Sequence, residues 1–165
     1  MQAGCMAEHK IMPCIWFDTD AGEAIEFYRS VFSDFREIER DDWPEGGSES
    51  ETGLLTAVIE IEGQRLMLLN GGPEFPQSES FSLVVDCADA AEVDYYWNAL
   101  LADGGVESQC GWLKDRFGLS WQVVPRVLNE YLRAPDRAKA RRVWEAMLSM
   151  QKLDVAALDA AYAGT

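Results

Sequence analysis

Two segments of the sequence repeat the same order of elements, and this repeat constrains the fold more than any other feature. Residues 11–32 and residues 81–102 each combine an apolar run of strand length with a pattern typical of an amphipathic helix. In the two helix patterns, Phe27-Tyr28 corresponds to Tyr96-Trp97 at an offset of 69 residues. Segments of strand character follow each helix, so each half predicts a strand, a helix and about three further strands.

The repeat and its flanking segments predict four regions along the chain. Residues 1–10 are expected to form a flexible leader, because they lack the apolar stretch of a signal peptide. The first module is expected at residues 11–79, the second at residues 80–125 and a C-terminal helical extension at residues 126–165. Within the first module, residues 44–52 have the Gly- and Ser-rich composition of a mobile loop.

Hydrophobic periodicity assigns the individual elements. Strands are expected at residues 11–17, 35–43, 54–61, 65–69, 81–86, 106–113 and 119–124. Helices are expected at residues 23–32, 88–102, 126–133, 136–152 and 155–162. Asp89, Asp136 and Asp154 each stand where an N-cap would begin a helix.

The charge of the chain limits its partners. The 29 acidic residues outnumber the 14 basic ones, which gives a net charge of −15. Nucleic acids and anionic membrane surfaces are therefore not expected as partners, because both are bound through Lys and Arg. No apolar run is long enough to predict a membrane span. Residues 34–62 are acidic and residues 136–152 are basic, so these segments are either solvated faces or surfaces that dock on each other.

The cysteine pattern argues against a zinc site and favours a reducing compartment. The only histidine is His9, in the predicted leader, and no two cysteines form a C-x-x-C pair. Free thiols and a cytoplasmic location are therefore expected. Cys110, close to Lys114, is the best candidate for a nucleophile, but the module has no histidine to act as its base. No catalytic residue is assigned. The four cysteines are Cys5, Cys14, Cys87 and Cys110.

Several motifs resemble those of one known family. The first helix carries A-x-x-F-Y-x-x-V-F at residues 24–32, and a D-x-x-G turn stands at residues 115–118. Both resemble the vicinal oxygen chelate (glyoxalase/bleomycin-resistance) superfamily. Longer blocks, within residues 11–163, resemble its PhnB-like branch, whose members are widely labelled demethylubiquinone methyltransferases. These blocks are residues 16–18, 69–73, 93–97, 109–115, 118–125 and 152–154.

The resemblance implies an α+β fold in which paired βαβββ modules form an open, barrel-like cup, followed by C-terminal helices. It also implies a homodimer. Active members of the superfamily hold a divalent metal in the cup, with ligands from the first and fourth strands of each module. Here the matching positions carry a thiol, a thioether, a hydroxyl and an amide, at about Cys14, Met67, Ser82 and Gln122. Hard cations prefer carboxylates and imidazoles, so neither a metal nor another cofactor is expected.

The methyltransferase label is not supported by the residues. A fold of the usual kind for S-adenosylmethionine needs a Gly-rich loop between a strand and a helix of a parallel sheet. The three double glycines do not open a helix after a strand, and the hairpins expected here are antiparallel. These pairs are Gly46-Gly47, Gly71-Gly72 and Gly104-Gly105.

Without a metal, the cup is expected to bind a small, partly apolar molecule with little or no catalysis. Gln122 is the best candidate, because a buried amide can orient a carbonyl group. Trp16 and Trp121 are alternatively core residues, and Asn70 a turn residue. Two other functions stay open: a metal-independent enzyme for a small carbonyl or quinone-like substrate, and an interaction protein with a closed cup. The candidate ligand-binding residues are Cys14, Trp16, Met67, Asn70, Ser82, Trp112, Trp121 and Gln122.

Overall fold

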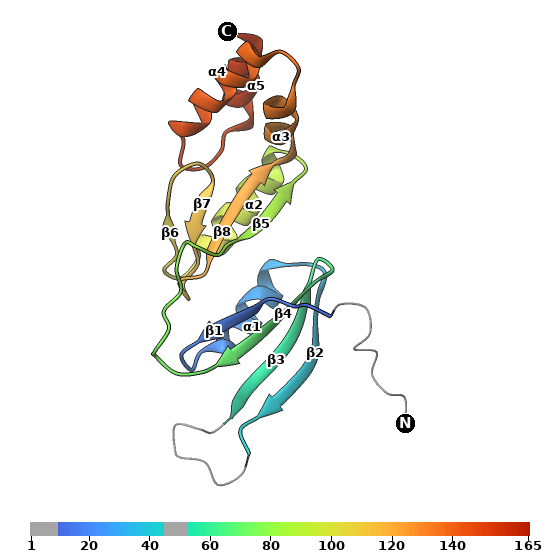
Figure 1. The fold of residues 1–165 in the computed structure, drawn as a ribbon, viewed down its shortest axis with the longest axis vertical. Coiled ribbons are helices and arrows are strands. Elements are labelled where there is room, and N and C mark those ends of the chain that lie inside the picture. The colour runs from blue at the N-terminus through green and yellow to red at the C-terminus, as the bar shows by residue number, and fades with distance from the viewer. Residues whose placement is uncertain (1–9, 45–52) are drawn as a thin grey trace. The chain divides into compact units, whose positions relative to one another are not determined.

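The computed structural model describes residues 10–44 and 53–165. The predicted leader and the predicted loop at residues 44–52 lie outside these ranges, apart from Lys10 and Pro44. The described residues form two four-stranded sheets and five helices. They divide into two compact units, Met1–Pro76 and Gln77–Thr165, and each unit has its own sheet (Figure 1).

The first unit is a βαβββ module. Its sheet has the strand order β1-β4-β3-β2, in which β1 pairs with β4 in parallel and the other pairs are antiparallel. The helix α1 contacts β2, β3 and β4. The elements are β1 (Cys14–Phe17), α1 (Ala21–Val31), β2 (Phe35–Asp42), β3 (Leu54–Ile61) and β4 (Gln64–Asn70).

The helix α1 packs on one face of this sheet through its apolar stripe. Ile25 and Tyr28 are fully buried on the helix, and Leu66 and Leu68 are fully buried on β4. Because side chains alternate between the two faces of a strand, Met67, between the two leucines, lies on the opposite face. The sequence pattern of β4 therefore assigns one face to the core and leaves the other without a helix.

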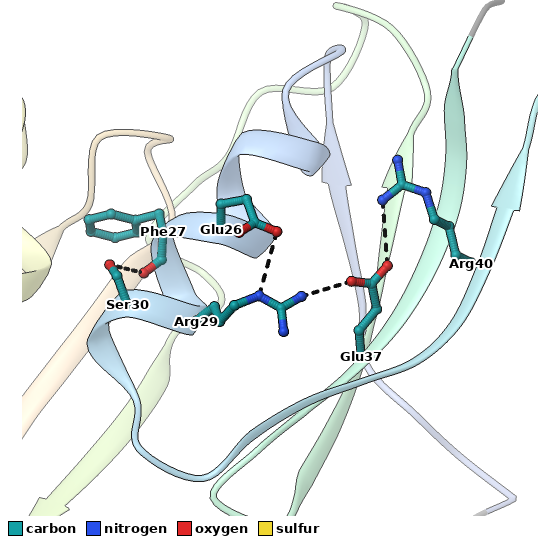
Figure 2. A network of polar contacts seen from close by, with 6 residues as sticks. All are labelled: Glu26, Phe27, Arg29, Ser30, Glu37 and Arg40. Atoms are coloured by element: carbon teal, nitrogen blue, oxygen red, sulfur yellow. Dashed lines mark hydrogen bonds and ion pairs between the residues drawn. The ribbon is translucent and has the colours of Figure 1, made fainter.

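A chain of ion pairs joins α1 to the exposed strand β2 (Figure 2). The guanidinium of Arg29 lies 3.5 Å from a carboxylate oxygen of Glu26 and 2.9 Å from one of Glu37. Arg40 contacts the other oxygen of Glu37 at 3.4 Å, and Arg29 also stacks on the Phe35 ring at 4.6 Å from its centre. Each such exposed pair contributes only about 0.2–1 kcal/mol, so the network orients β2 more than it stabilises the unit.

The second unit repeats the topology of the first. Its strand order is β5-β8-β7-β6, again with one parallel pair, β5 with β8. Gly63 and Gly118 occupy the turns before the last strand of each module, with φ of 80° and 82°. The predicted repeat of βαβββ modules is therefore confirmed. The elements are β5 (Leu83–Cys87), α2 (Ala90–Leu101), β6 (Val106–Glu107), β7 (Trp112–Lys114) and β8 (Ser120–Pro125).

One predicted strand and one predicted helix are interrupted by the same contact. Residues 106–113 were expected to form one strand but form β6 and β7, because Cys110 and Gly111 have φ of 59° and 83°. Their N–H groups donate to the carbonyls of Met150 (2.8 Å) and Gln151 (2.7 Å). These two carbonyls lie within the helix expected at residues 136–152, which ends at Leu148 instead.

Three helices complete the second unit. Their core contains Leu128, Val143, Met147, Leu153 and Leu158. As predicted, Asp136 accepts N-terminal N–H groups of α4, and Asp154 accepts one of α5. Within residues 10–44 and 53–165, no helix has the length and apolar character needed to cross a membrane. The helices are α3 (Arg126–Arg133), α4 (Arg137–Leu148) and α5 (Val155–Ala163).

Candidate functional site

Three of the predicted ligand-binding residues lie together on the sheet of the first unit. The parallel register pairs Cys14 with Met67 and Trp16 with Leu69, so these four side chains share one face. We call them the first open face. Their sequence neighbour Leu68 is fully buried on the other face, toward α1. The structure therefore brings Cys14, Trp16 and Met67 together.

The indole of Trp16 is held by the loop that follows β4. Its Nε1 donates to the carbonyl of Gly72 at 2.7 Å, and its ring meets the ring of Phe75 edge-on at 5.0 Å between centres. A Cβ on Gly71 would lie 2.2 Å from Cζ2 of Trp16. These contacts fix the Trp16 ring against the loop after β4, while the side chain stays partly exposed.

Replacing Gly71 with Ala should destabilise the first unit by about 1–3 kcal/mol, because the new methyl group occupies the place of the Trp16 ring. Urea unfolding followed by tryptophan fluorescence measures this loss. Gly22→Ala is the matched control, since a Cβ at Gly22 meets no atom within 4 Å. Equal unfolding midpoints for the two variants would show that Trp16 does not pack on Gly71.

Asn70 lies on the opposite face from Met67 and anchors the fold. Its Oδ1 accepts the N–H of Ala21 at 2.9 Å, and its Nδ2 donates to the carbonyl of Leu54 at 2.9 Å. Asp20, the N-cap residue of α1, makes no side-chain capping bond, so Asn70 satisfies an N-terminal N–H of this helix instead. The structure does not bring Asn70 to the first open face.

Ionic contacts cover the end of the first sheet near the β3–β4 turn. The carboxylate of Glu60 pairs with Arg36 and, at 3.0 Å, with Arg65. The hydrogen bond from Arg65 is the main cause that holds the pKa of Glu60 below its usual value. Glu60 therefore stays ionised near neutral pH and serves the sheet as the partner of two cations.

The remaining predicted residues lie on the sheet of the second unit. The register pairs Gln122 with Val84 on one side and with Trp112 on the other. The Nε2 group of Gln122 donates to Oγ of Ser82 at 2.9 Å. We call Ser82, Val84, Trp112 and Gln122 the second open face. Val84 is the direct neighbour of Gln122 on β5, and the Ser82 side chain reaches the amide from two residues earlier.

Trp121 faces the core rather than this surface. Its ring is 2% exposed, and its Nε1 donates to Oδ2 of Asp115 at 2.9 Å. The other oxygen of Asp115 accepts the N–H groups of Phe117 (2.9 Å) and Leu119 (3.1 Å). The D-x-x-G turn is thus organised by a buried carboxylate, and Trp121 is one of the groups that it holds.

Burial makes the thiols of two described cysteines weaker acids. Burial is the main cause that raises the pKa of Cys87 to about 12, and burial also raises the pKa of Cys14. Cys110 packs against the core of the C-terminal helices, and its backbone N–H is bound to Met150. Among the described residues, no group of three or more His, Cys, Asp or Glu side chains could hold a metal ion.

The sequence reasoning missed a small pocket beside the second open face. It has a volume of about 160 Å³, and Lys114, Ser120 and Glu79 contribute its polar groups. Ser120 and Gln122 alternate with Trp121 and Val123, so the period of two along β8 already placed Ser120 on the same face as Gln122. The lining residues are Glu79, Val106, Glu107, Ser108, Trp112, Leu113, Lys114 and Ser120.

Comparisons with known proteins identify related chains. The family model of 3-demethylubiquinone-9 3-methyltransferase matches residues 9–124. A PhnB protein from Bacillus cereus is 27% identical, with a TM-score of 0.64 over 71% of this chain and 99% of that chain. Protein PA1353 from Pseudomonas aeruginosa is 21% identical, with a TM-score of 0.58 over 72% of this chain and 98% of that chain.

The same fold occurs in a resistance protein. The fosfomycin resistance protein FosX from Listeria monocytogenes is 15% identical, with a TM-score of 0.55 over 78% of this chain and 100% of that chain. No curated protein matches the chain. The structural likeness confirms the expected glyoxalase-type architecture of two βαβββ modules, here as two open sheets rather than a closed barrel.

Proposed function

Because the chain belongs to the PhnB-type 3-demethylubiquinone-9 3-methyltransferase family of the glyoxalase superfamily, we propose that it binds a small, partly apolar molecule. The site is the second open face, and binding uses no metal and involves little or no catalysis. The observation that carries the proposal is the Gln122 amide. Its nitrogen is engaged by Ser82, whereas its oxygen accepts no hydrogen bond from the described residues. This oxygen is available to orient a ligand above Val84 and Trp112.

The metal of the superfamily does not fit this chain. FosX has been solved with manganese(II), which shows that the fold can hold a divalent ion in that protein. In this chain the corresponding donors are the soft sulfurs of Cys14 and Met67 and the neutral groups of Ser82 and Gln122. Manganese and magnesium prefer carboxylate and imidazole ligands, so this donor set is unsuited to either.

The fold does not support the methyltransferase activity that the family's name states either. Dinucleotide- and S-adenosylmethionine-type sites use a Gly-rich loop that leads from a parallel strand into a helix N-terminus. Among the described strands, each sheet has a single parallel pair. Gly71-Gly72 follows β4 into a loop, and Gly104-Gly105 follows the helix α2. We therefore propose binding rather than methyl transfer.

The proposal includes the homodimer and the cytoplasmic location expected from the sequence. Cys14, Cys87 and Cys110 are free thiols, which supports a reducing compartment. A net charge of −15 opposes self-association at long range, so a dimer must bury apolar area. Exposed apolar side chains at Trp144 and Leu148, outside the second open face, supply such area on the second unit.

Replacing Gln122 with Ala should reduce ligand retention while the protein remains folded. Gln122 is only partly buried, so the expected loss of stability is about 1 kcal/mol or less. Native mass spectrometry of protein purified without added metal should show an adduct of roughly a few hundred daltons, which the variant loses.

Gln109→Ala is the matched control, because Gln109 is an exposed amide of the same unit outside the open face. It should keep the adduct. An unfolded Gln122→Ala variant would make Gln122 a core group, and full retention of the adduct by this variant would place the ligand elsewhere. A stoichiometric metal ion in the wild-type spectrum would contradict the donor-set argument.

A further inference from the structure

The pocket beside the second open face contains a buried hydroxyl without a partner. Ser120 is 1% exposed, and within residues 10–44 and 53–165 its Oγ is the one buried side-chain oxygen or nitrogen that has no hydrogen bond. Such a group costs free energy, and an alanine would fill the same position without that cost. The antiparallel register pairs Ser120 with Lys114, so both side chains lie on the face that carries the pocket.

The single cation that lines this pocket is held by a carboxylate from the connecting loop. Nζ of Lys114 lies 2.5 Å from Oε1 of Glu79, and the hydrogen bond from Lys114 keeps the pKa of Glu79 below its usual value. The Glu79 side chain is 65% exposed, so it can leave the ammonium at little cost. The pocket therefore already binds a carboxylate, supplied by its own chain.

The pocket also continues into the proposed binding surface. Trp112 lines the pocket and belongs to the second open face, where it lies beside Gln122. A volume of about 160 Å³ is below the range of roughly 300–1,000 Å³ that drug-sized ligands occupy. The pocket thus has room for one polar group of a ligand whose apolar part extends over the Trp112 ring.

We propose that this pocket binds the carboxylate of a small organic acid, with the Lys114 ammonium and the Ser120 hydroxyl as donors and Glu79 displaced from Lys114. The inference rests on the proposed function, since it assigns a ligand class to the same surface. Ionised acceptors make the stronger hydrogen bonds, which favours the acid over its neutral amide. A singly charged group fits better than a phosphate dianion, because one cation lines the pocket and Glu79 and Glu107 are close by.

The test compares a matched pair of probes, 2-naphthoate and 2-naphthamide, by ligand-observed NMR titration of the full chain. The acid should bind about 10-fold more tightly than the amide, which is the gain of one charge-assisted contact. Lys114→Met, or Lys114→Gln if the first variant is unstable, should abolish this preference. Lys152→Met is the matched control and should keep it, because Lys152 pairs with Asp94 away from the pocket.

Two further variants separate the roles of the hydroxyl and the carboxylate. Ser120→Ala should weaken naphthoate binding about 3–10-fold and leave the melting temperature unchanged or raised, since it removes an unpaired buried group. Glu79→Gln should strengthen naphthoate binding about 3-fold, because the competing carboxylate is gone. Both effects should be smaller for the amide, whose oxygen carries no charge.

The outcomes distinguish this inference from the proposed function. Equal binding of acid and amide would overturn the carboxylate pocket and leave the binding surface standing. Binding of neither probe would count against both. A preference for the acid that survives Lys114→Met would overturn the assignment of the pocket, and weaker acid binding by Glu79→Gln would show that Glu79 does not compete with the ligand.

Discussion

Replacing Asp115 with Ala should destabilise the second unit by about 3–5 kcal/mol, because one buried carboxylate satisfies three donors. Asp115 is 2% exposed and accepts N–H groups of Phe117, Leu119 and Trp121. Without it, the buried amide of Leu119 and the buried indole N–H of Trp121 lose this acceptor. Urea unfolding monitored by circular dichroism measures the loss as a lower midpoint.

Asp115→Asn should lower the stability of the second unit by about half as much as Asp115→Ala. The new amide oxygen can still accept the two backbone N–H groups, whereas the new amide NH2 group faces the indole N–H. Asp86→Ala is the control, since Asp86 is an exposed carboxylate with a 3.0 Å contact to Arg126. A loss below about 1 kcal/mol for Asp115→Ala would mean that water replaces the carboxylate and that the turn is not held by it.

Replacing Gly111 with Ala should cost about 3–4 kcal/mol, from backbone strain and from a clash that no side-chain rotation removes. The φ of Gly111 is 83°, and a Cβ there would lie 2.8 Å from the carbonyl oxygen of Val123 and 2.9 Å from Cδ1 of Leu153. The expected result is a lower midpoint in urea together with earlier proteolysis after α3, because the C-terminal helices lose their attachment at Gln151.

Gly63→Ala is the matched control that measures only the backbone strain of an alanine at a positive φ. Its φ is 80°, and a Cβ at Gly63 meets no atom within 4 Å, so the expected loss is about 1 kcal/mol. The difference between the two variants measures the clash with Val123 and Leu153. If both variants lost the same stability, Gly111 would be required only for its backbone conformation and the contact with Leu153 would be unimportant.

The sequence predicted correctly those elements whose bounds are determined by residues close to them in the chain. Asp89 caps α2 as expected, since its carboxylate accepts the N–H groups of Ala91 and Glu92. The strand expected at residues 54–61 is β3 at the same bounds, because this largely apolar run is bounded by Gly53 and by the turn at Gly63. The strand expected at residues 106–113 was wrong because its break depends on Met150 and Gln151, which are distant in sequence.

Part of the candidate site could be predicted from the alternation of side chains along each strand. Side chains on a strand alternate, so Trp121 and Gln122 cannot line one face. The structure places Gln122 on the second open face and Trp121 in the core, and Asn70 is likewise opposite Met67. The pocket at Ser120 was missed because its Glu79 side chain comes from the loop before β5, which carries no periodic signal.

The bond between Gly111 and Gln151 limits how far this chain can be shortened. The family model matches residues 9–124, yet two amide groups inside that segment donate to carbonyls that lie after it. The second sheet and the C-terminal helices are therefore joined through the backbone as well as through side chains. A chain cut after Pro125 would leave the N–H groups of Cys110 and Gly111 without these acceptors.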